Sequence, residues 1–266
     1  MERKLFTVND FSGGEQSSLS EERIQANAAV VAKNGLIDID KTFYKRNLAS
    51  LIDAVGTSTA RVVNHCEFNT SAGVKYHIVA YTDGRVYYYK EGTAIAFTEI
   101  TGFASDFGDT ADIDMISYAD LVWMIDGKYA YTWDGTTLTR VDSAGAGALW
   151  AADFDDAKYI EQQHGLIYMA GYTADPAAVM FSRYTDDAGL YINPTDTDAW
   201  VATNIFKIPQ EGQIITALFA YNNSLLIFTK DKVWELTGDV ASTNSVLREL
   251  YSYAGCYDHK SIAEVR

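Results

Sequence analysis

The stretch LVWMIDGKYAYTWDG, residues 121–135, joins an apolar run to an alternating aromatic run through Asp126-Gly127. Asp-Gly between two such runs predicts a β-hairpin with a type I′ turn, because both central residues of that turn need positive φ. Side chains two residues apart share one face of a strand. The returning strand therefore places three aromatic rings on one face: Tyr129, Tyr131 and Trp133.

A second copy of this pattern precedes the first. Residues 76–82 (YHIVAYT) run into Asp83-Gly84 and return through residues 85–90 (RVYYYK), which carry Tyr87 and Tyr89. Asp83-Gly84 lies 43 residues before Asp126-Gly127, and the turns that end the two hairpins, Glu91-Gly92 and Asp134-Gly135, have the same separation. A short third strand is predicted after each, at residues 97–100 and 138–141. This equal spacing indicates an internal repeat.

Further copies are looser. Residues 225–229 (LLIFT) turn at Lys230-Asp231 and return as KVWEL, which contains Trp234, and residues 166–182 hold another hairpin. A period of about 40–45 residues built from hairpins is typical of β-propeller blades, which stack so that neighbours cover each other's aromatic faces. We therefore expect the strand aromatics to pack between blades.

The sequence predicts an all-β protein. Residues 43–266 form a propeller-like array of antiparallel blades with three or four strands each. About four or five blades are visible, a further blade starts near residue 255, and the ring is incomplete or open. Residues 1–42 read as an extended arm that contains a short helix over residues 20–32, with acidic residues in its first turn and Asn34-Gly35 at its end.

Composition excludes several function classes. A net charge of −15 over 266 residues disfavours a surface that grips DNA or anionic membranes. Two cysteines, Cys66 and Cys256, make no disulfide framework for a domain of this size. The N-terminus lacks the apolar stretch of a secretory signal, and no run is long enough to span a membrane, so we expect synthesis in the cytoplasm.

Candidate chemistry is sparse. Two acidic clusters could hold Ca²⁺, although solvated loops are the expected reading: Asp106, Asp109, Asp112 and Asp114, and Asp153, Asp155 and Asp156. Cys256 and His259 have C-x-x-H spacing, but His65 and Cys66 point to opposite faces of a strand and would not complete a zinc set. No nucleophile elbow, phosphate loop or metalloprotease motif is present. We expect no catalytic residues, metal or cofactor, and hence not an enzyme.

Three stretches together resemble tailed-bacteriophage virion β-propeller proteins, components of the tail or neck of the nozzle or hub kind. The first is an N-terminal F-x-G-G followed by an Asn and a G-L…K-R segment, here Phe11, Gly13, Gly14, Asn27, Gly35 and Arg46. The second is the strand, turn and return over residues 164–183. The third joins residues 224–236 to Gly255-Cys256 and Ser261-Ile262. Relatives continue well beyond this last segment.

The resemblance implies a non-enzymatic structural subunit of a virion tail or neck. It would form part of a homo-oligomeric ring around the DNA path and dock neighbouring virion proteins through the arm. DNA would pass nearby without sequence-specific binding, because an acidic lumen repels phosphates. The alternative is a propeller that binds or cleaves glycans in host-surface recognition, with exposed aromatic rings stacking on sugars. A generic protein-interaction propeller is a third reading.

Overall fold

The computed structural model describes residues 60–93, 97–102, 107, 112–145, 147–150, 155–185, 191–209, 212–240, 244–252 and 255–262, together with four short backbone segments before residue 60. The chain divides into two compact units, Met1–Ile52 and Asp53–Arg266. The boundary expected between residues 42 and 43 falls inside the first unit.

The first unit contains four short strands. β1 (Gly14–Glu15) pairs in parallel with β2 (Ala28–Ala29), and β3 (Gly35–Ile37) pairs antiparallel with β4 (Phe43–Lys45). The helix predicted over residues 20–32 lies outside the described residues apart from its residues 28 and 29. Those two residues are extended, because they pair with β1 instead of with a preceding helical turn.

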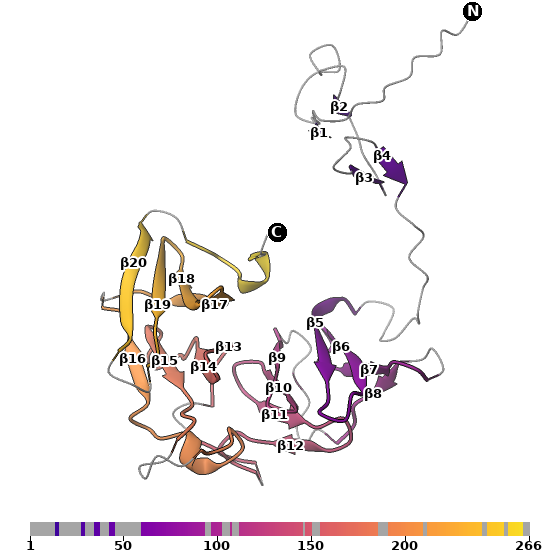
Figure 1. Ribbon diagram of the computed structural model, residues 1–266, viewed down its shortest axis with the longest axis horizontal. Coiled ribbons are helices and arrows are strands. Elements are labelled where there is room, and N and C mark those ends of the chain that lie inside the picture. The colour runs from indigo at the N-terminus through magenta and orange to yellow at the C-terminus, as the bar shows by residue number, and fades with distance from the viewer. Residues whose placement is uncertain are drawn as a thin grey trace, which may run out of the picture. The chain divides into compact units, whose positions relative to one another are not determined.

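The second unit is a β-propeller of four blades, and each blade is a four-stranded antiparallel sheet (Figure 1). Blade 1 contains β5 (Val62–Asn69), β6 (Lys75–Tyr81), β7 (Val86–Lys90) and β8 (Thr98–Glu99). Blade 2 contains β9 (Asp114–Tyr118), β10 (Leu121–Ile125), β11 (Ala130–Trp133) and β12 (Leu138–Arg140). Blade 3 contains β13 (Tyr159–Gln163), β14 (Leu166–Ala170), β15 (Ala178–Phe181) and β16 (Ile205–Lys207). Blade 4 contains β17 (Ile215–Tyr221), β18 (Ser224–Thr229), β19 (Lys232–Thr237) and β20 (Val246–Ser252).

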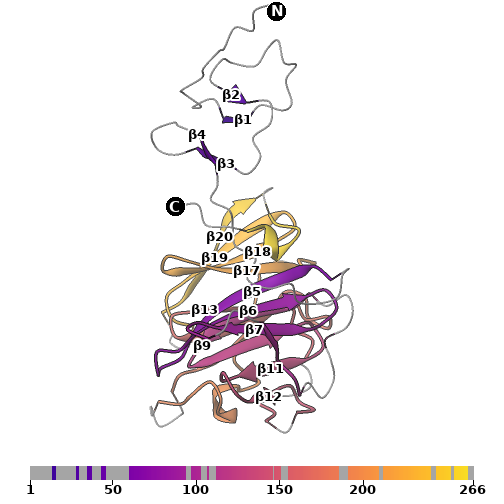
Figure 2. The ribbon, with the colours of Figure 1, turned by 90° about the vertical axis from the view of Figure 1, so that its right-hand side faces the viewer.

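Strand order within every blade follows the chain, so each blade is a simple meander. The first strands of successive blades lie side by side: β5 contacts β9, β9 contacts β13, and β13 contacts β17. These four are the inner strands, and β8, β12, β16 and β20 form the outer edges. Figure 2 shows blade 1, with β5, β6 and β7 running across the view. The all-β propeller predicted from the hairpin repeat is confirmed.

Three hydrophobic cores join the four blades. Ile78 and Phe68 of blade 1 pack with Val122 and Met124 of blade 2. The opposite face of blade 2 packs on blade 3, and the opposite face of blade 3 packs on blade 4. Side chains alternate between the two faces of a strand, so each inner blade contributes one face to the core with the preceding blade and the other face to the core with the following blade. Within the described residues, no core joins blade 4 to blade 1.

The aromatic residues divide between cores and outer faces. Tyr131 and Trp133 are buried between blades 1 and 2 with Tyr129 packed against them, as the spacing of two predicts. Trp234 is buried between blades 3 and 4. Tyr87 and Tyr89 lie elsewhere than expected: Tyr88 takes the core position of β7, and alternation turns its two neighbours to the outer face of blade 1.

The Asp-Gly turns differ from the expected type. Gly127 has a φ of 83°, but Asp126 is not among the residues with positive φ, so the turn is not type I′. The loop instead closes through the Asp126 carboxylate, which accepts hydrogen bonds from the backbone N–H of Lys128 and Tyr129 at 2.9 and 2.7 Å. Consecutive positive φ values occur at Ala119-Asp120, between β9 and β10.

A further blade is expected to start near residue 255, and the structure describes the beginning of that segment. Among its described residues, Gly255 to Ile262, the regular element is a 3₁₀ turn, η4 (His259–Ser261). Backbone Cys256 N–H donates to the carbonyl of Thr229, and η4 lies against β17. The segment therefore returns over the inner strands.

Candidate functional site

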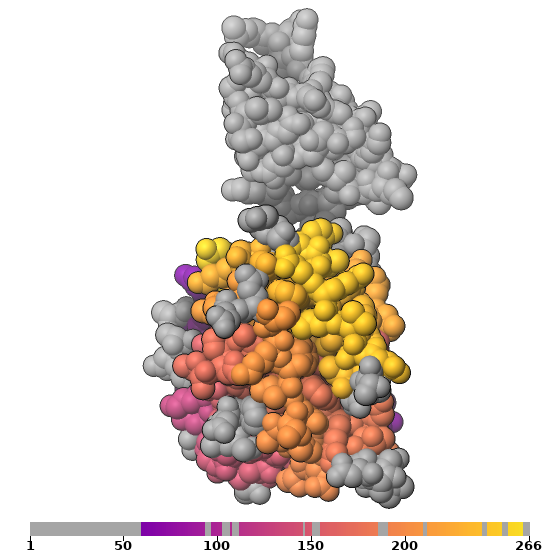
Figure 3. Space-filling view, turned by 90° about the vertical axis from the view of Figure 1, so that its left-hand side faces the viewer, coloured from indigo at the N-terminus to yellow at the C-terminus, as the bar shows by residue number. Residues whose placement is uncertain are grey.

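Blade 4 has one covered face and one uncovered face. Ile227 and Leu236 point into the core with blade 3. The opposite face, which we call the blade-4 outer face, carries Tyr221, Leu226, Phe228, Val246 and Tyr251, as the strand register requires. Tyr221, Val246 and Tyr251 are 44%, 56% and 60% exposed. Figure 3 shows the outer part of this blade, in yellow, at the molecular surface.

The blade-4 outer face also contains an ion pair. Arg248 Nη2 lies 2.6 Å from Glu235 Oε2, and Glu235 accepts a second hydrogen bond from Ser224. These contacts hold the pKa of Glu235 below its usual value, with the Ser224 hydroxyl contributing most. The blade-4 outer face is thus mostly apolar, and its polar side chains Ser224, Glu235 and Arg248 bind one another. Such a face suits contact with another protein surface.

The other end of the blade series is also uncovered within the described residues. The outer face of blade 1 carries Tyr87, edge-on to Tyr81, and Tyr89, stacked on His77 with ring centroids 5.9 Å apart. His77 Nε2 lies 2.8 Å from Glu91 Oε1. This face combines aromatic rings with ion pairs. The series of blades thus ends on two different faces, one mostly apolar and one mixed.

The inner strands enclose a central cavity of about 440 Å³, and η4 forms part of its wall. Its polar lining includes two buried carboxyl groups. Asp114 accepts hydrogen bonds from Asn64 Nδ2 and from the backbone N–H groups of Met115 and Ile160. Glu161 accepts from the backbone N–H of Gln162 and Ala220. Burial raises the pKa of both groups.

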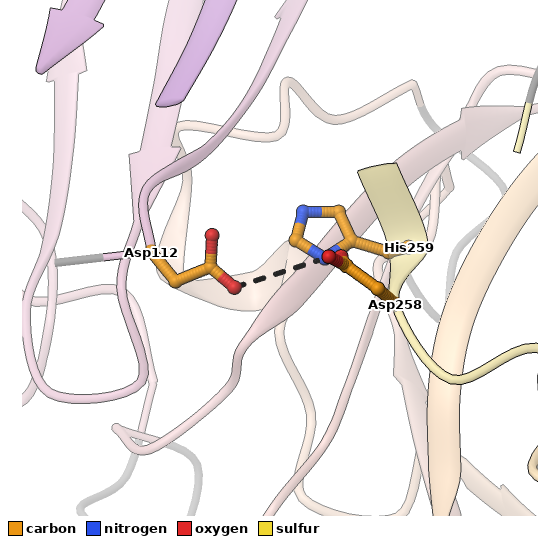
Figure 4. Close-up of side chains that lie close together, drawn as sticks. All are labelled: Asp112, Asp258 and His259. Carbon is orange, nitrogen blue, oxygen red and sulfur yellow. Dashed lines mark ion pairs between the residues drawn. The ribbon is translucent and has the colours of Figure 1, made fainter. Parts of the chain in front are cut away.

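A charged cluster lies where η4 meets β9. His259 Nε2 is 3.7 Å from Asp114 Oδ1, and its Nδ1 is 4.0 Å from Asp112 Oδ2 and 3.6 Å from Asp258 Oδ1 (Figure 4). The Lys260 ammonium pairs with Asp112 Oδ1. Burial lowers the pKa of Lys260. These contacts fasten the end of the described chain to the start of blade 2.

The sequence singled out Asp112, Asp114 and His259, but not Asp258 and Lys260, and not the association of these residues. Asp112 and Asp114 belong to a predicted acidic loop whose Asp106 and Asp109 lie outside the described residues. Cys256 is not one of the grouped ligand residues, and its thiol donates a hydrogen bond to the backbone carbonyl of Asp258. Burial raises the pKa of the Cys66 thiol to about 12, so that cysteine is a protonated, packed side chain. Lys260 and Asp112 are 148 residues apart in the sequence, so a local sequence pattern cannot predict their contact.

The second acidic cluster forms local contacts. Asp155 binds the backbone N–H and hydroxyl of Ser143, and Asp156 accepts from Thr173 N–H at 2.7 Å. Asp153 lies outside the described residues. The Asp155 and Asp156 carboxylates therefore stabilise local loop structure through hydrogen bonds.

The remaining predicted residues fall into two groups. In the arm, Gly14 lies in β1 and Gly35 in β3, while the other members lie outside the described residues: Phe11, Gly13, Asn27 and Arg46. The turn residues all lie between adjacent strands of one blade: Asp83 and Gly84 between β6 and β7, Asp126 and Gly127 between β10 and β11, and Lys230 and Asp231 between β18 and β19. None of these turn residues lines the central cavity.

No family model matches the chain, and no curated protein matches it. Solved structures similar to it include the extracellular domain of BT4673 from B. thetaiotaomicron, with a TM-score of 0.47 and 13% identity over 82% of this chain and 27% of that one. Chaetomium thermophilum Raptor has a TM-score of 0.44 and 9% identity over 79% of this chain and 18% of its own. The chain thus spans about a quarter or less of these proteins. The computationally designed Ika4 protein has a TM-score of 0.39 and 11% identity, over 72% of this chain and all of its own.

The described part of the chain contains no helix with the length and apolar character that crossing a bilayer requires.

Proposed function

We propose that this protein is a non-enzymatic structural subunit of a tailed-phage tail or neck, and that copies of it join into a ring around the DNA path. The observation that supports assembly is the uncovered blade-4 outer face, where Tyr221, Val246 and Tyr251 are all exposed. Inside the molecule, the equivalent faces of blades 1, 2 and 3 are each buried by the next blade. An uncovered face at the end of the series favours a protein partner.

The partner of this face is a second copy of the chain. Within the chain, every interface joins the rear face of one blade to the front face of the next, and blade 1 has a front face that no described residue covers. On that face Tyr89 and Val79 are partly exposed and offer aromatic and apolar contact area. Head-to-tail contacts of this kind close into a ring when the rotation that relates one copy to the next divides a full turn evenly.

The net charge of −15 supports the position along a DNA path. Carboxylates around a lumen repel phosphates, whereas clustered Lys and Arg would hold the DNA in place. The phage assignment itself depends on the sequence resemblance over the arm, residues 164–183 and residues 224–262. Docking of neighbouring virion proteins through the arm belongs to the same proposal.

Immunogold electron microscopy tests this location. Antibody raised against the chain should label the tail or neck of tailed particles purified from its source, before or after mild disruption. Absence of label from both samples, although the antibody recognises the purified chain, would refute the virion role. Saturable binding on a glycan array, abolished by Tyr257→Ala, would favour the alternative of host-surface recognition, because the Tyr257 side chain is 81% exposed and exposed aromatic rings can stack on sugars.

A further inference from the structure

We propose that Asp112, Asp258 and His259 bind one first-row divalent metal ion, of the Zn²⁺ class. Each residue offers one ligand atom, and the three atoms lie within 4.8 Å of one another. His259 Nδ1 is 3.6 Å from Asp258 Oδ1 and 4.0 Å from Asp112 Oδ2. Two donors that are each about 2.1 Å from one Zn²⁺ are roughly 3.4 Å apart at the tetrahedral angle and further apart at wider angles. The spacing is therefore that of ligands around one small cation.

The imidazole of His259 supplies a second, independent observation. Its side chain is only 10% exposed, and within the described residues neither ring nitrogen has a hydrogen-bond partner; Nε2 is also buried. A buried imidazole without a hydrogen bond is costly, because its ring nitrogens lose their contacts with water. Its Nδ1 is directed between the two Asp carboxylates (Figure 4), so an ion bound there would take that nitrogen as a ligand, while the buried Nε2 faces Asp114.

The far side of the ring is arranged as in known metal centres. Nε2 faces Asp114 Oδ1 at 3.7 Å. Asn64 and two backbone N–H groups fix that carboxylate in place. A histidine that binds a metal through one nitrogen commonly directs the other nitrogen to a carboxylate, which sets the tautomer and strengthens the ligand. Asp114 is thus a positioning residue for His259.

Ligand type selects the class of ion. One imidazole nitrogen with two carboxylate oxygens suits Zn²⁺, Co²⁺ or Mn²⁺, whereas Ca²⁺ and Mg²⁺ prefer all-oxygen sets. The side chains of Asp112 and Asp258 are 61% and 63% exposed, so water completes the coordination. The Lys260 ammonium pairs with Oδ1 of Asp112, and the other carboxylate oxygen, Oδ2, faces His259.

Metal binding would connect two distant parts of the fold. Asp112 lies two residues before β9, the inner strand of blade 2, whereas Asp258 caps η4 and His259 begins it, after blade 4. The ion therefore fastens η4 across the central cavity and links the two parts of the propeller. This role is independent of ring assembly, because none of the three ligands lies on the blade-4 outer face.

The test is titration of the full-length, EDTA-treated chain with Co²⁺, followed by visible absorption, and with Zn²⁺, followed by calorimetry. At about pH 7.5 imidazole is mostly neutral and able to bind. We expect one ion per chain, with His259→Ala and Asp112→Asn each weakening binding at least about tenfold, since each loses a direct ligand. His77→Ala is the matched control, because His77 also lies between two carboxylates, Glu67 and Glu91, and should leave binding unchanged.

Asp114→Asn separates positioning from ligation. It should weaken Zn²⁺ binding by about tenfold to a hundredfold and shift the Co²⁺ absorption bands, while binding stays at one ion per chain. The proposal is overturned if the wild-type chain takes up no ion at millimolar Co²⁺ or Zn²⁺, or if Asp112→Asn binds as tightly as wild type. Asp112 is exposed, so this variant keeps the test valid even if His259→Ala fails to fold.

Discussion

Asp114 and Glu161 show what the sequence hides at the level of single residues. Both are carboxylates on inner strands, and both are buried against the central cavity. Sequence reasoning placed Asp114 in an acidic loop and did not single out Glu161, because a charge count does not tell which carboxylates lose water. The hydrogen bonds that compensate them come from residues far away in the sequence, such as Asn64 and Ala220.

Glu161 gives a prediction about pH. Burial raises its pKa in the folded state, so the native protein holds this proton over a pH range where the unfolded chain has released it. Its contribution to stability is therefore largest below the unfolded pKa and is lost as pH rises through the folded pKa. Glu161→Gln should remove this contribution and flatten the pH dependence, as measured by urea unfolding at several pH values. An unchanged dependence would contradict this account of Glu161, and Glu99→Gln on exposed β8 is the control.

Asp142 gives a prediction about stability. Its side chain is 1% exposed, lies 2.8 Å from Arg140 Nε, and accepts hydrogen bonds from Ala130 and Ala144 N–H. Asp142→Ala leaves the buried Ala130 N–H and the partly buried Arg140 guanidinium without this partner, so we expect a loss of about 3 kcal/mol in the free energy of unfolding. Chemical denaturation measures it. Asp198→Ala, in the exposed 3₁₀ turn η3 (Thr197–Ala199), should change stability by no more than about 0.5 kcal/mol; equal effects would refute the role of Asp142.

Among the elements, the hairpins were predictable, whereas the inner strands β9, β13 and β17 were not. Strands β14 and β15 lie within the hairpin predicted over residues 166–182, and β18 and β19 each differ from the predicted strand by one residue at one end. These strands carry dense apolar or aromatic runs bounded by turn residues. The inner strand β13 (YIEQQ) is polar because one side faces the cavity, and so lacks the pattern that marks a strand. The inner strands β9 and β17 were missed as well.

Trp133 tests the claim that aromatic faces hold the blades together. It is 2% exposed and contacts the rings of Phe68, Tyr76 and Tyr88 across the interface between blades 1 and 2. Trp133→Ala should lower the free energy of unfolding by about 3–5 kcal/mol, because it leaves a cavity in that core. Thermal and urea unfolding give the value. Tyr191→Ala is the reference, since Tyr191 is 71% exposed, and the claim fails if both variants lose the same stability.

For the whole molecule, the repeat predicted the propeller but not how the series of blades ends. The prediction of an incomplete or open ring agrees with the described residues, which form three cores for four blades. The segment near residue 255, where a further blade is expected to start, carries η4. A local pattern cannot reveal where this segment packs, because its contacts join Lys260 and His259 to Asp112 across the fold.

The claim that copies of the chain join through the blade-4 outer face is tested most directly by sedimentation velocity over a range of concentrations. Wild type should form species larger than a monomer, whereas the double variant Val246→Glu with Tyr251→Glu should sediment as a monomer, because two charges enter an apolar contact. Tyr191→Glu, an exposed position outside this face, should assemble like wild type. A wild-type chain that stays monomeric at every concentration, or a double variant that assembles as well as wild type, would contradict the account.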